Sequence, residues 1–222
     1  REYWLRGARL MGAQSRLQAI RSLRVVLVTT ASDVQFRIEA GIGQVRLPEP
    51  IFSPLLQSLA DRRIHTLDAL EQQLRPAGIQ LEQLLEAVTV LIALGHVAVV
   101  QEDAAVASVR QRCQRLNDHL LQSAIDGSSI GHLASPLTGG GIAVTRFQQL
   151  FLLARRQGFQ SPPEWSDFAW QHLRSTPLKL HKDERLLDTP DAIRSELARQ
   201  AIKFAERELP VLQTLGVAAP SL

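Results

Sequence analysis

The sequence predicts a mainly α-helical protein of the α+β class, with a winged-helix-like module followed by a mainly helical C-terminal domain that carries short β strands. Beyond residue 48, apolar side chains recur mostly at helical spacing, whereas alternation with a period of two is confined to short runs near the N-terminus. A chain of 222 residues can bury a core and form one or two domains. We therefore expect three regions, residues 1–47, 48–101 and 102–222.

Residues 1–47 are expected to form a short mixed α/β segment with a hairpin. Arg24–Thr30 is rich in β-branched residues, which is typical of a strand. From Val34 to Glu39 apolar and polar residues alternate, as in a half-buried strand. The glycines of Gly41–Gly43 then allow a turn into the next strand, so a hairpin is predicted here.

Residues 48–101 follow the order helix, helix, helix, strand, which is the order of a winged-helix module. Thr66 is the expected cap of the second helix, and Val97–Val100 is the expected strand. The outward positions of the third helix are polar but carry no Lys or Arg: Gln80, Glu82, Gln83, Glu86 and Thr89. Two carboxylates there would repel DNA phosphates, so we expect a protein-contact or architectural role and no nucleic-acid partner.

Residues 102–222 contain several clear helix signals. Asp103 is the expected cap of a helix that runs to about Ala124. Thr145 and Gln148 form a T-x-x-Q capping box, and Ser161 and Glu164 form a second one. Later signals are Thr189–Pro190 as the start of the last helix, Pro210 as its kink or restart, and Gly216 as its end.

Composition limits the partners and the compartment. The net charge is +3, but basic and acidic residues are interspersed along the chain without a block of one sign. No apolar run approaches the roughly 20 residues that a transmembrane helix needs, and no signal-peptide pattern is present, so we expect no membrane partner and a cytoplasmic location. Arg1 is not preceded by an initiator methionine, and we expect the chain to be part of a longer protein.

No catalytic constellation can be assembled from the spacing of residues. Cys113 is the only cysteine, and six histidines show neither H-x-x-x-H nor H-E-x-x-H spacing, so no metal site is expected. A G-x-S-x-G elbow is missing as well. The glycine triplet Gly139–Gly141 is not followed about 20 residues later by the acidic residue that a dinucleotide site requires. We predict no catalytic, cofactor-binding or metal residues on this chain, and a small enzyme with an unrecognised site is the weakest hypothesis.

Four segments carry a resemblance to a known family: the opening Arg1–Arg9, the stretch His132–Gly158 with its glycine triplet and capped helix, and two parts of the tail, Thr189–Arg194 and Glu208–Gly216. They resemble the C-terminal regulatory portion of a group of bacterial S-adenosylmethionine-dependent methyltransferases. The resemblance extends over nearly the whole chain and is loosest between Pro48 and Gln101. It is carried by phrases of sequence and not by a catalytic motif.

The resemblance implies a non-catalytic regulatory or substrate-recognition region. Its partner would be an upstream catalytic domain that binds S-adenosylmethionine, and the substrate would be a protein that is methylated on lysine in some relatives. The alternative is a freestanding winged-helix adaptor for protein–protein interaction. The candidate contact surface is the loop ahead of the capped helix, where backbone N–H groups could meet a polar or anionic partner: Ser135, Thr138, Gly139, Gly140, Gly141, Arg146 and Gln148. Replacing Gly140 with valine is expected to disturb this loop more than the distant helices.

Overall fold

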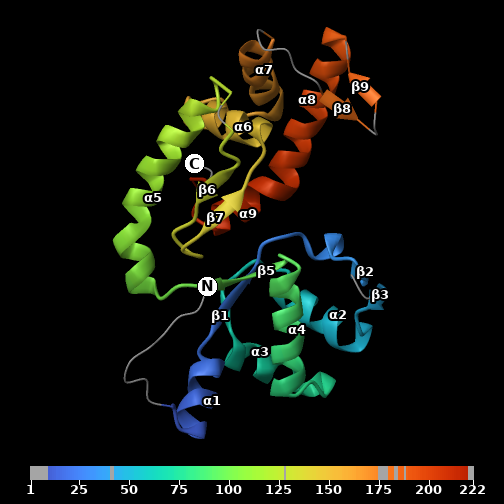
Figure 1. Ribbon diagram of the computed structural model, residues 1–222, viewed down its shortest axis with the longest axis vertical. Coiled ribbons are helices and arrows are strands. Elements are labelled where there is room, and N and C mark those ends of the chain that lie inside the picture. Colours follow the sequence, from blue (N-terminus) through green and yellow to red (C-terminus); the bar gives the residue numbers. More distant parts are fainter. Residues whose placement is uncertain are drawn as a thin grey trace. The chain divides into compact units, whose positions relative to one another are not determined.

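The computed structural model describes residues 10–40, 43–127, 129–174, 180–182, 185–187 and 189–219. Helices dominate, and the strands are short and paired antiparallel, so the chain is mainly α within the α+β class, as predicted (Figure 1). The chain divides into two compact units. Unit 1 consists of the described residues up to Leu27 and of Ala31–Val100, and unit 2 consists of Val28–Thr30 and the described residues from Gln101 onwards.

The helices and most strands of unit 1 are labelled in Figure 1. Its elements are α1 (Ala13–Arg21), β1 (Arg24–Leu27), the 3₁₀ turn η1 (Ala31–Asp33), β2 (Arg37–Ala40), β3 (Gly43–Arg46), α2 (Glu49–Leu59), β4 (His65–Thr66), α3 (Leu67–Leu74), the 3₁₀ turn η2 (Arg75–Ala77), α4 (Leu81–Ala93) and β5 (Val97–Val100).

The sheet of unit 1 joins regions that the sequence analysis had separated. Its strand order is β4-β1-β5, and both pairings are antiparallel. Arg24 of β1 lies opposite Thr66 on one side and Val100 on the other. Residues 1–47 and 48–101 therefore share one sheet, and the physical boundary along the chain lies after Val100.

The core of unit 1 forms between this sheet and the helices α2, α3 and α4. Its buried apolar side chains include Val25, Leu27, Phe52, Leu55, Leu59, Leu67, Leu70, Leu84, Val88 and Leu91. The helices and β5 follow one another in the expected order, but the middle strand of the sheet precedes them in the chain. The winged-helix assignment therefore stays a prediction.

The hairpin predicted near residue 40 is present. β2 pairs with β3 antiparallel, with Arg37 opposite Arg46 and Ala40 opposite Gly43. Two of the expected turn residues, 41 and 42, lie outside the described residues. The first strand begins at Arg37 and not at Val34, and the 3₁₀ turn η1 ends at Asp33, just before Val34.

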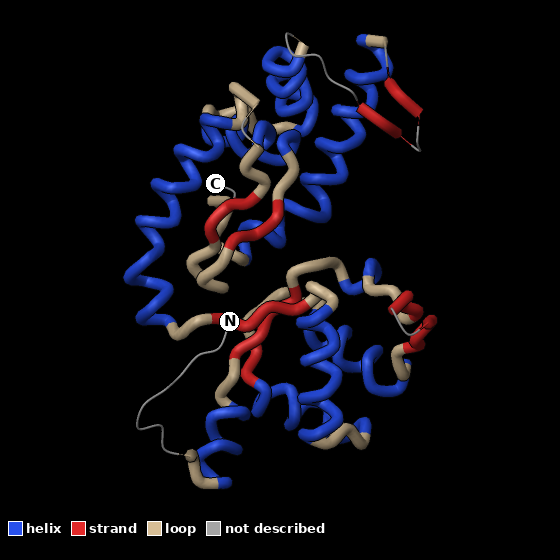
Figure 2. The backbone as a smooth tube through the Cα atoms, viewed as in Figure 1, coloured by secondary structure: helices blue, strands red, loops and turns tan. Residues whose placement is uncertain are grey.

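Unit 2 is mostly helical (Figure 2). Its elements are α5 (Asp103–Ser123), β6 (His132–Ala134), β7 (Gly141–Ala143), α6 (Arg146–Arg156), α7 (Pro162–Leu173), β8 (Leu180–Lys182), β9 (Arg185–Leu187), α8 (Pro190–Lys203), the π-helical turn η3 (Phe204–Glu208) and α9 (Leu209–Thr214).

An aromatic cluster lies at the centre of unit 2. Phe151 and Phe204 are fully buried, and their ring centroids are 5.6 Å apart. Trp165 is 3% exposed and meets Phe204 edge-on at 5.9 Å. Offset and edge-on arrangements are those that aromatic pairs prefer. Phe168, on the same helix as Trp165, is also buried.

The helix boundaries of unit 2 agree with most of the sequence signals. Thr189 caps α8 by accepting a hydrogen bond from the Ala192 N–H. The helix changes to the π-helical turn η3 just before Pro210, whose ring cannot donate a hydrogen bond. The prediction for Asp103 is wrong: it is the first residue of α5, and Glu102 occupies the cap position without a side-chain hydrogen bond.

Candidate functional site

The glycine-rich segment forms the turn of a β-hairpin, which the sequence analysis did not predict. β6 and β7 pair antiparallel, with Leu133 opposite Ile142 and Ala134 opposite Gly141. Four backbone N–H groups of the turn bond within it. Their pairings are Ser135 to the Gly140 carbonyl at 2.9 Å, Gly139 to the Ser135 carbonyl at 3.1 Å, Thr138 to the Ser135 hydroxyl at 3.2 Å, and Gly140 to the Thr138 hydroxyl at 3.3 Å. These donors are thus already occupied.

Ser135 joins the hairpin to the end of the chain. Its side chain is 1% exposed, and its hydroxyl donates to the Leu215 carbonyl oxygen at 2.7 Å. Gly216, the next residue, has φ +68°, and a Cβ on it would lie 2.9 Å from the Cγ of Pro136. Only glycine fits this close approach without a shift of the chain. The start of the turn and the end of α9 are therefore locked together.

Two side-chain amides hold the strands of this hairpin, and the sequence analysis missed both. The Asn117 amide nitrogen donates to the Ala134 carbonyl at 2.8 Å, and its oxygen accepts from the Ala134 N–H at 2.7 Å. Asn117 lies on α5 and is 1% exposed. Its amide makes with Ala134 of β6 the two hydrogen bonds that a neighbouring strand would otherwise make. The Gln149 amide donates to the Ile130 carbonyl at 2.8 Å. Fully bonded buried amides of this kind fix one arrangement of a fold.

Arg146 and Gln148, both predicted contact residues, connect helices of unit 2. The Arg146 guanidinium donates to the Ala124 and Ile125 carbonyls, each at 3.0 Å, and so satisfies acceptors at the C-terminal end of α5. Gln148 accepts from the Thr145 N–H at 2.7 Å, which confirms the predicted capping box. Its amide nitrogen also donates to the Glu208 carboxylate. A carboxylate oxygen of Glu208 lies 3.4 Å from the Lys203 ammonium, so Glu208 has two side-chain partners.

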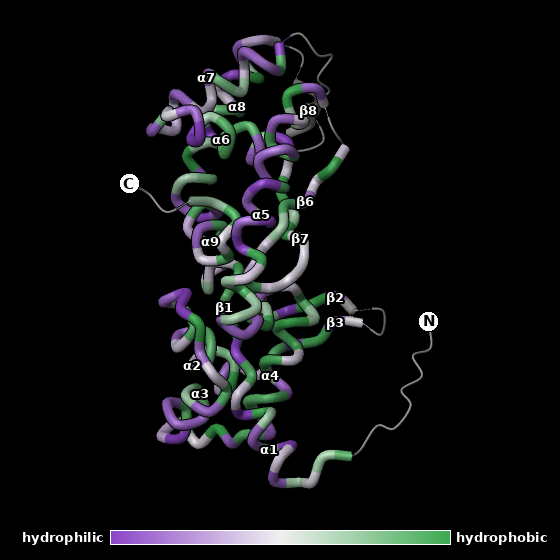
Figure 3. The backbone as a smooth tube through the Cα atoms, turned by 90° about the vertical axis from the view of Figure 1, so that its left-hand side faces the viewer, coloured by the Kyte–Doolittle hydropathy of each residue, from purple (hydrophilic) through white to green (hydrophobic). Residues whose placement is uncertain are grey.

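A shallow apolar groove runs between the hairpin and α5, and we call it the hairpin groove. Its volume is about 450 Å³, and it is lined by Val109, Cys113, Leu116, Leu120, His132, Leu133, Ala134, Ser135, Gly139, Gly140 and Gly141. The four residues from α5 are spaced by four, three and four positions and so form one stripe along the helix. Most of α5 is hydrophilic (Figure 3), so this stripe is a mainly apolar strip on a polar helix.

The predicted contact residues therefore fall into two groups. Ser135, Thr138, Arg146 and Gln148 are hydrogen-bonded within the unit. The three glycines line the hairpin groove and are exposed. Leu116, which the sequence analysis did not single out, is 49% exposed in the same groove. The helical spacing of Leu116 from Val109 and Leu120 is the sequence signal that could have identified it.

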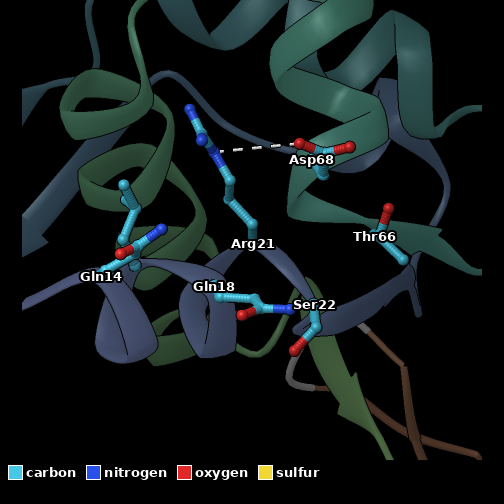
Figure 4. Close-up of a pocket in the computed structure, with 7 residues that line it drawn as sticks. Gln14, Gln18, Arg21, Ser22, Thr66 and Asp68 are labelled. Atoms are coloured by element: carbon cyan, nitrogen blue, oxygen red, sulfur yellow. Dashed lines mark ion pairs between the residues drawn. The ribbon is translucent and has the colours of Figure 1, made fainter. Parts of the chain in front are cut away.

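A second hollow, of about 540 Å³, lies between α1 and α3 in unit 1 (Figure 4). Its main charged group is Arg21, which donates to both carboxylate oxygens of Glu71 at 2.9 and 3.0 Å. Arg21 is also 3.8 Å from Asp68. The hydrogen bond to Glu71 and its negative charge raise the pKa of Arg21. Since α1 has no buried residue, the two hydrogen bonds from Arg21 to Glu71 attach this helix to α3. The Arg21 guanidinium therefore already has a structural partner.

The described residues contain no group of three or more His, Cys, Asp or Glu side chains arranged to hold a metal ion. Among the same residues, no helix combines the length and the apolar character needed to span a bilayer. Cys113 is half-buried in the hairpin groove.

Comparison with known proteins gives one informative relative. The chain is 28% identical over 217 residues to the uncharacterized protein sll1526 of Synechocystis sp., and the match covers 98% of the chain but 42% of the relative. The chain therefore spans less than half the length of the protein that it matches. No family profile and no solved structure match it.

Proposed function

We propose that this chain is a non-catalytic regulatory or substrate-recognition region of an S-adenosylmethionine-dependent methyltransferase. The cofactor would bind to a catalytic domain elsewhere in the same polypeptide, and the substrate would be a protein that is methylated on lysine. Such an enzyme would act in the cytoplasm. The proposal begins from the resemblance of His132–Gly158 and of the tail parts Thr189–Arg194 and Glu208–Gly216 to the regulatory portion of these enzymes.

The observation that carries the proposal is that His132–Gly158 and the tail pack against each other. The hydroxyl of Ser135 donates to Leu215, and the amide of Gln148 donates to Glu208. Phe151 of the first segment also packs in the core against Phe204, which lies between the two parts of the tail, with ring planes tilted by 51°. Segments that are distant in sequence but packed together are expected to be inherited as a unit. The resemblance of these segments therefore supports a shared structure and not only short stretches of similar sequence.

The length of the relative also supports the proposal. The match with the Synechocystis protein includes 98% of this chain and leaves more than half of the relative unmatched. A relative of that length has room for a further domain of ordinary size. In the proposed enzyme, that further part would supply the methyl-transfer chemistry.

The hairpin groove is the surface on which the catalytic domain or the protein substrate would be recognised. It is apolar, it is open to solvent, and it is built on rigid elements, namely a 21-residue helix and a hairpin held by buried amides. An apolar groove with exposed leucine suits an interface whose affinity comes from apolar burial.

The test uses the full-length protein that contains this chain, incubated with radiolabelled S-adenosylmethionine and protein substrates from its own cells. We expect lysine methylation, and we expect Leu116→Glu to lower its rate about tenfold without changing cofactor affinity, because a charge in an apolar contact is costly. Ile202→Glu is the matched control, since Ile202 is 50% exposed on α8 and does not line the groove.

Three results would contradict the proposal. The full-length protein could fail to bind S-adenosylmethionine, the isolated chain could catalyse turnover by itself, or the two variants could behave alike. Binding of a protein partner by a full-length protein that binds no cofactor would favour the alternative, a freestanding winged-helix adaptor.

A further inference from the structure

Besides the hairpin groove, unit 2 contains a pocket between α6, α7 and the segment Ala218–Ala219, which we call the Arg155 pocket. It has a volume of about 500 Å³, within the range of small-molecule sites. It is lined by Leu152, Arg155, Arg156, Gly158, Phe159, Gln160, Trp165, Leu209, Ala218 and Ala219. Most of this lining is apolar, and two guanidinium groups supply its charge.

The two arginines differ in how their charges are met. Arg156 forms an ion pair with Asp118 of α5. The Arg155 guanidinium lies over the Trp165 ring at 5.8 Å from the centroid, and no acidic side chain in the described part of the chain pairs with it. Burial lowers the pKa of Arg155, yet a guanidinium remains protonated in proteins. The pocket thus presents a partly desolvated positive charge.

Arg194 makes a similar aromatic contact at a more exposed position, where its side chain is 55% exposed. Arg194 lies over the Trp170 ring at 5.7 Å and is also 3.7 Å from a carboxylate oxygen of Asp167. Arg155 has the aromatic contact without the carboxylate. Arg155 is partly desolvated and has no carboxylate partner, so an anion that enters the pocket would gain a favourable ion pair with it.

We propose that the Arg155 pocket binds a small molecule with one carboxylate on an apolar body. The carboxylate pairs with the Arg155 guanidinium, whose planar fork matches two carboxylate oxygens. The Gln160 side chain lines the pocket and can supply a further donor. The apolar body lies against Phe159, Leu209 and Ala218. This site is separate from the hairpin groove and does not depend on the proposed function.

A purely structural role for Arg155 leads to a different expectation. The residue lies in the last turn of α6, where a positive charge interacts favourably with the helix dipole. In that case, replacing Arg155 would lower the melting temperature and would not alter binding of any acid. Binding and stability therefore have to be measured on the same variants.

The experiment titrates 1-naphthoate into the full chain and follows the heat of binding and the fluorescence of the probe. We expect saturable one-to-one binding, and we expect Arg155→Met to weaken it about tenfold or more, as for loss of a charge-assisted hydrogen bond. The matched control Arg194→Met should leave binding unchanged. Ala219→Phe, at an exposed position on the rim, should block binding while the protein remains folded. The neutral isostere 1-naphthylmethanol should bind at least about tenfold more weakly than the acid.

Several outcomes would overturn the site. Naphthoate could fail to saturate, the neutral isostere could bind as well as the acid, or Arg155→Met could lose stability but keep its affinity. A capped peptide with an interior Leu-Glu pair forms the last arm of the test. Saturation by the peptide alone would assign the pocket to a protein partner instead of a small acid.

Discussion

Buried polar side chains determine how the glycine-rich hairpin is held. Ser135, Asn117 and Gln149 are each at most 2% exposed, and each is hydrogen-bonded to backbone groups distant in sequence. Among the described residues, no buried side-chain polar atom is left without a hydrogen-bond partner. Removing one of these groups would therefore leave a buried donor or acceptor unpaired, which costs more than the bond itself contributes.

Ser135→Ala tests this at a single atom. The change removes the hydroxyl that donates to the Leu215 carbonyl and accepts from the Thr138 N–H. We expect the free energy of unfolding to fall by about 1–3 kcal/mol. Urea denaturation measures it, with Ser108→Ala as the control, because the Ser108 hydroxyl is exposed and bonds only to Ala105 within α5. Equal effects of the two changes would show that the hydrogen bond from Ser135 to Leu215 does not stabilise the fold.

The turn glycines are not equivalent, which refines the expectation for Gly140. Gly139 has φ +69°, whereas a Cβ on Gly140 would meet nothing closer than the Thr138 hydroxyl at 3.9 Å. Gly139→Ala should therefore destabilise the protein by about 1–2 kcal/mol, the cost of placing a Cβ in the left-handed region. Gly140→Ala should be close to neutral. Thermal melting of the two variants checks this, and the reverse order would contradict the geometry.

The sequence identified part of this network and missed part of it. Ser135 was named because it lies in the glycine-rich loop ahead of the capped helix, but its buried bond to Leu215 spans 80 residues and leaves no local pattern. Asn117 did leave a signal, because it shares the buried stripe of α5 with Val106 and Leu121. A polar residue in an apolar stripe requires an internal partner. The identity of that partner could come only from the folded structure.

Elements that end in local caps follow the sequence closely. The boxes at Thr145–Gln148 and Ser161–Glu164 and the cap at Thr189 form as predicted, because each depends on residues within one turn. β6 and β7 were missed, since strands of three residues are too short to show alternation. Their pairing is decided by Asn117 and the Leu215 contact and not by their own residues.

The cap of α7 makes stability depend on pH. Hydrogen bonds from the Ser161 hydroxyl and N–H and from the Gln160 N–H lower the pKa of Glu164 below its usual 4.5. A carboxyl with a lowered folded-state pKa stabilises the protein above its unfolded-state pKa, and this contribution is lost as pH falls through the folded-state value. Glu164→Gln should therefore lower the melting temperature at neutral pH and bring it close to that of the wild type in strong acid.

Melting temperatures measured by circular dichroism across this acid range check the expectation. Glu49→Gln is the control, because Glu49 also lies in a first helical turn but is exposed and pairs only with Arg46. A constant difference between wild type and Glu164→Gln at every pH would contradict the role of the charged carboxylate.

At the scale of the molecule, two units account for the chain, and each has its own core. The boundary after Val100 was visible in the sequence as the end of a predicted strand. The inclusion of β1 in the sheet of unit 1 was not, because β1 pairs with strands that follow it by about 40 and 70 residues. Pairing over such distances is decided by packing against the helices α2 to α4 and not by local propensity.

The proposed function makes a prediction for the isolated 222-residue chain. Because the catalytic domain of the proposed enzyme would lie outside it, we expect calorimetry to detect no tight one-to-one binding of S-adenosylmethionine. The full-length protein should bind the cofactor, and it serves as the positive control. Tight binding by the isolated chain would place a cofactor site on these residues and overturn the proposal.

The sequence by itself determined the fold class, the caps at Thr145, Ser161 and Thr189, and the position of the glycine-rich loop, because these depend on interactions between residues a few positions apart. Only the tertiary structure decided that the loop is a hairpin clamped by Asn117 and Ser135, that β1 completes a sheet with β4 and β5, and that Arg155 lacks the carboxylate that Arg194 has. Such contacts join residues distant in the chain, and their energy comes from burial and pairing that no local pattern encodes.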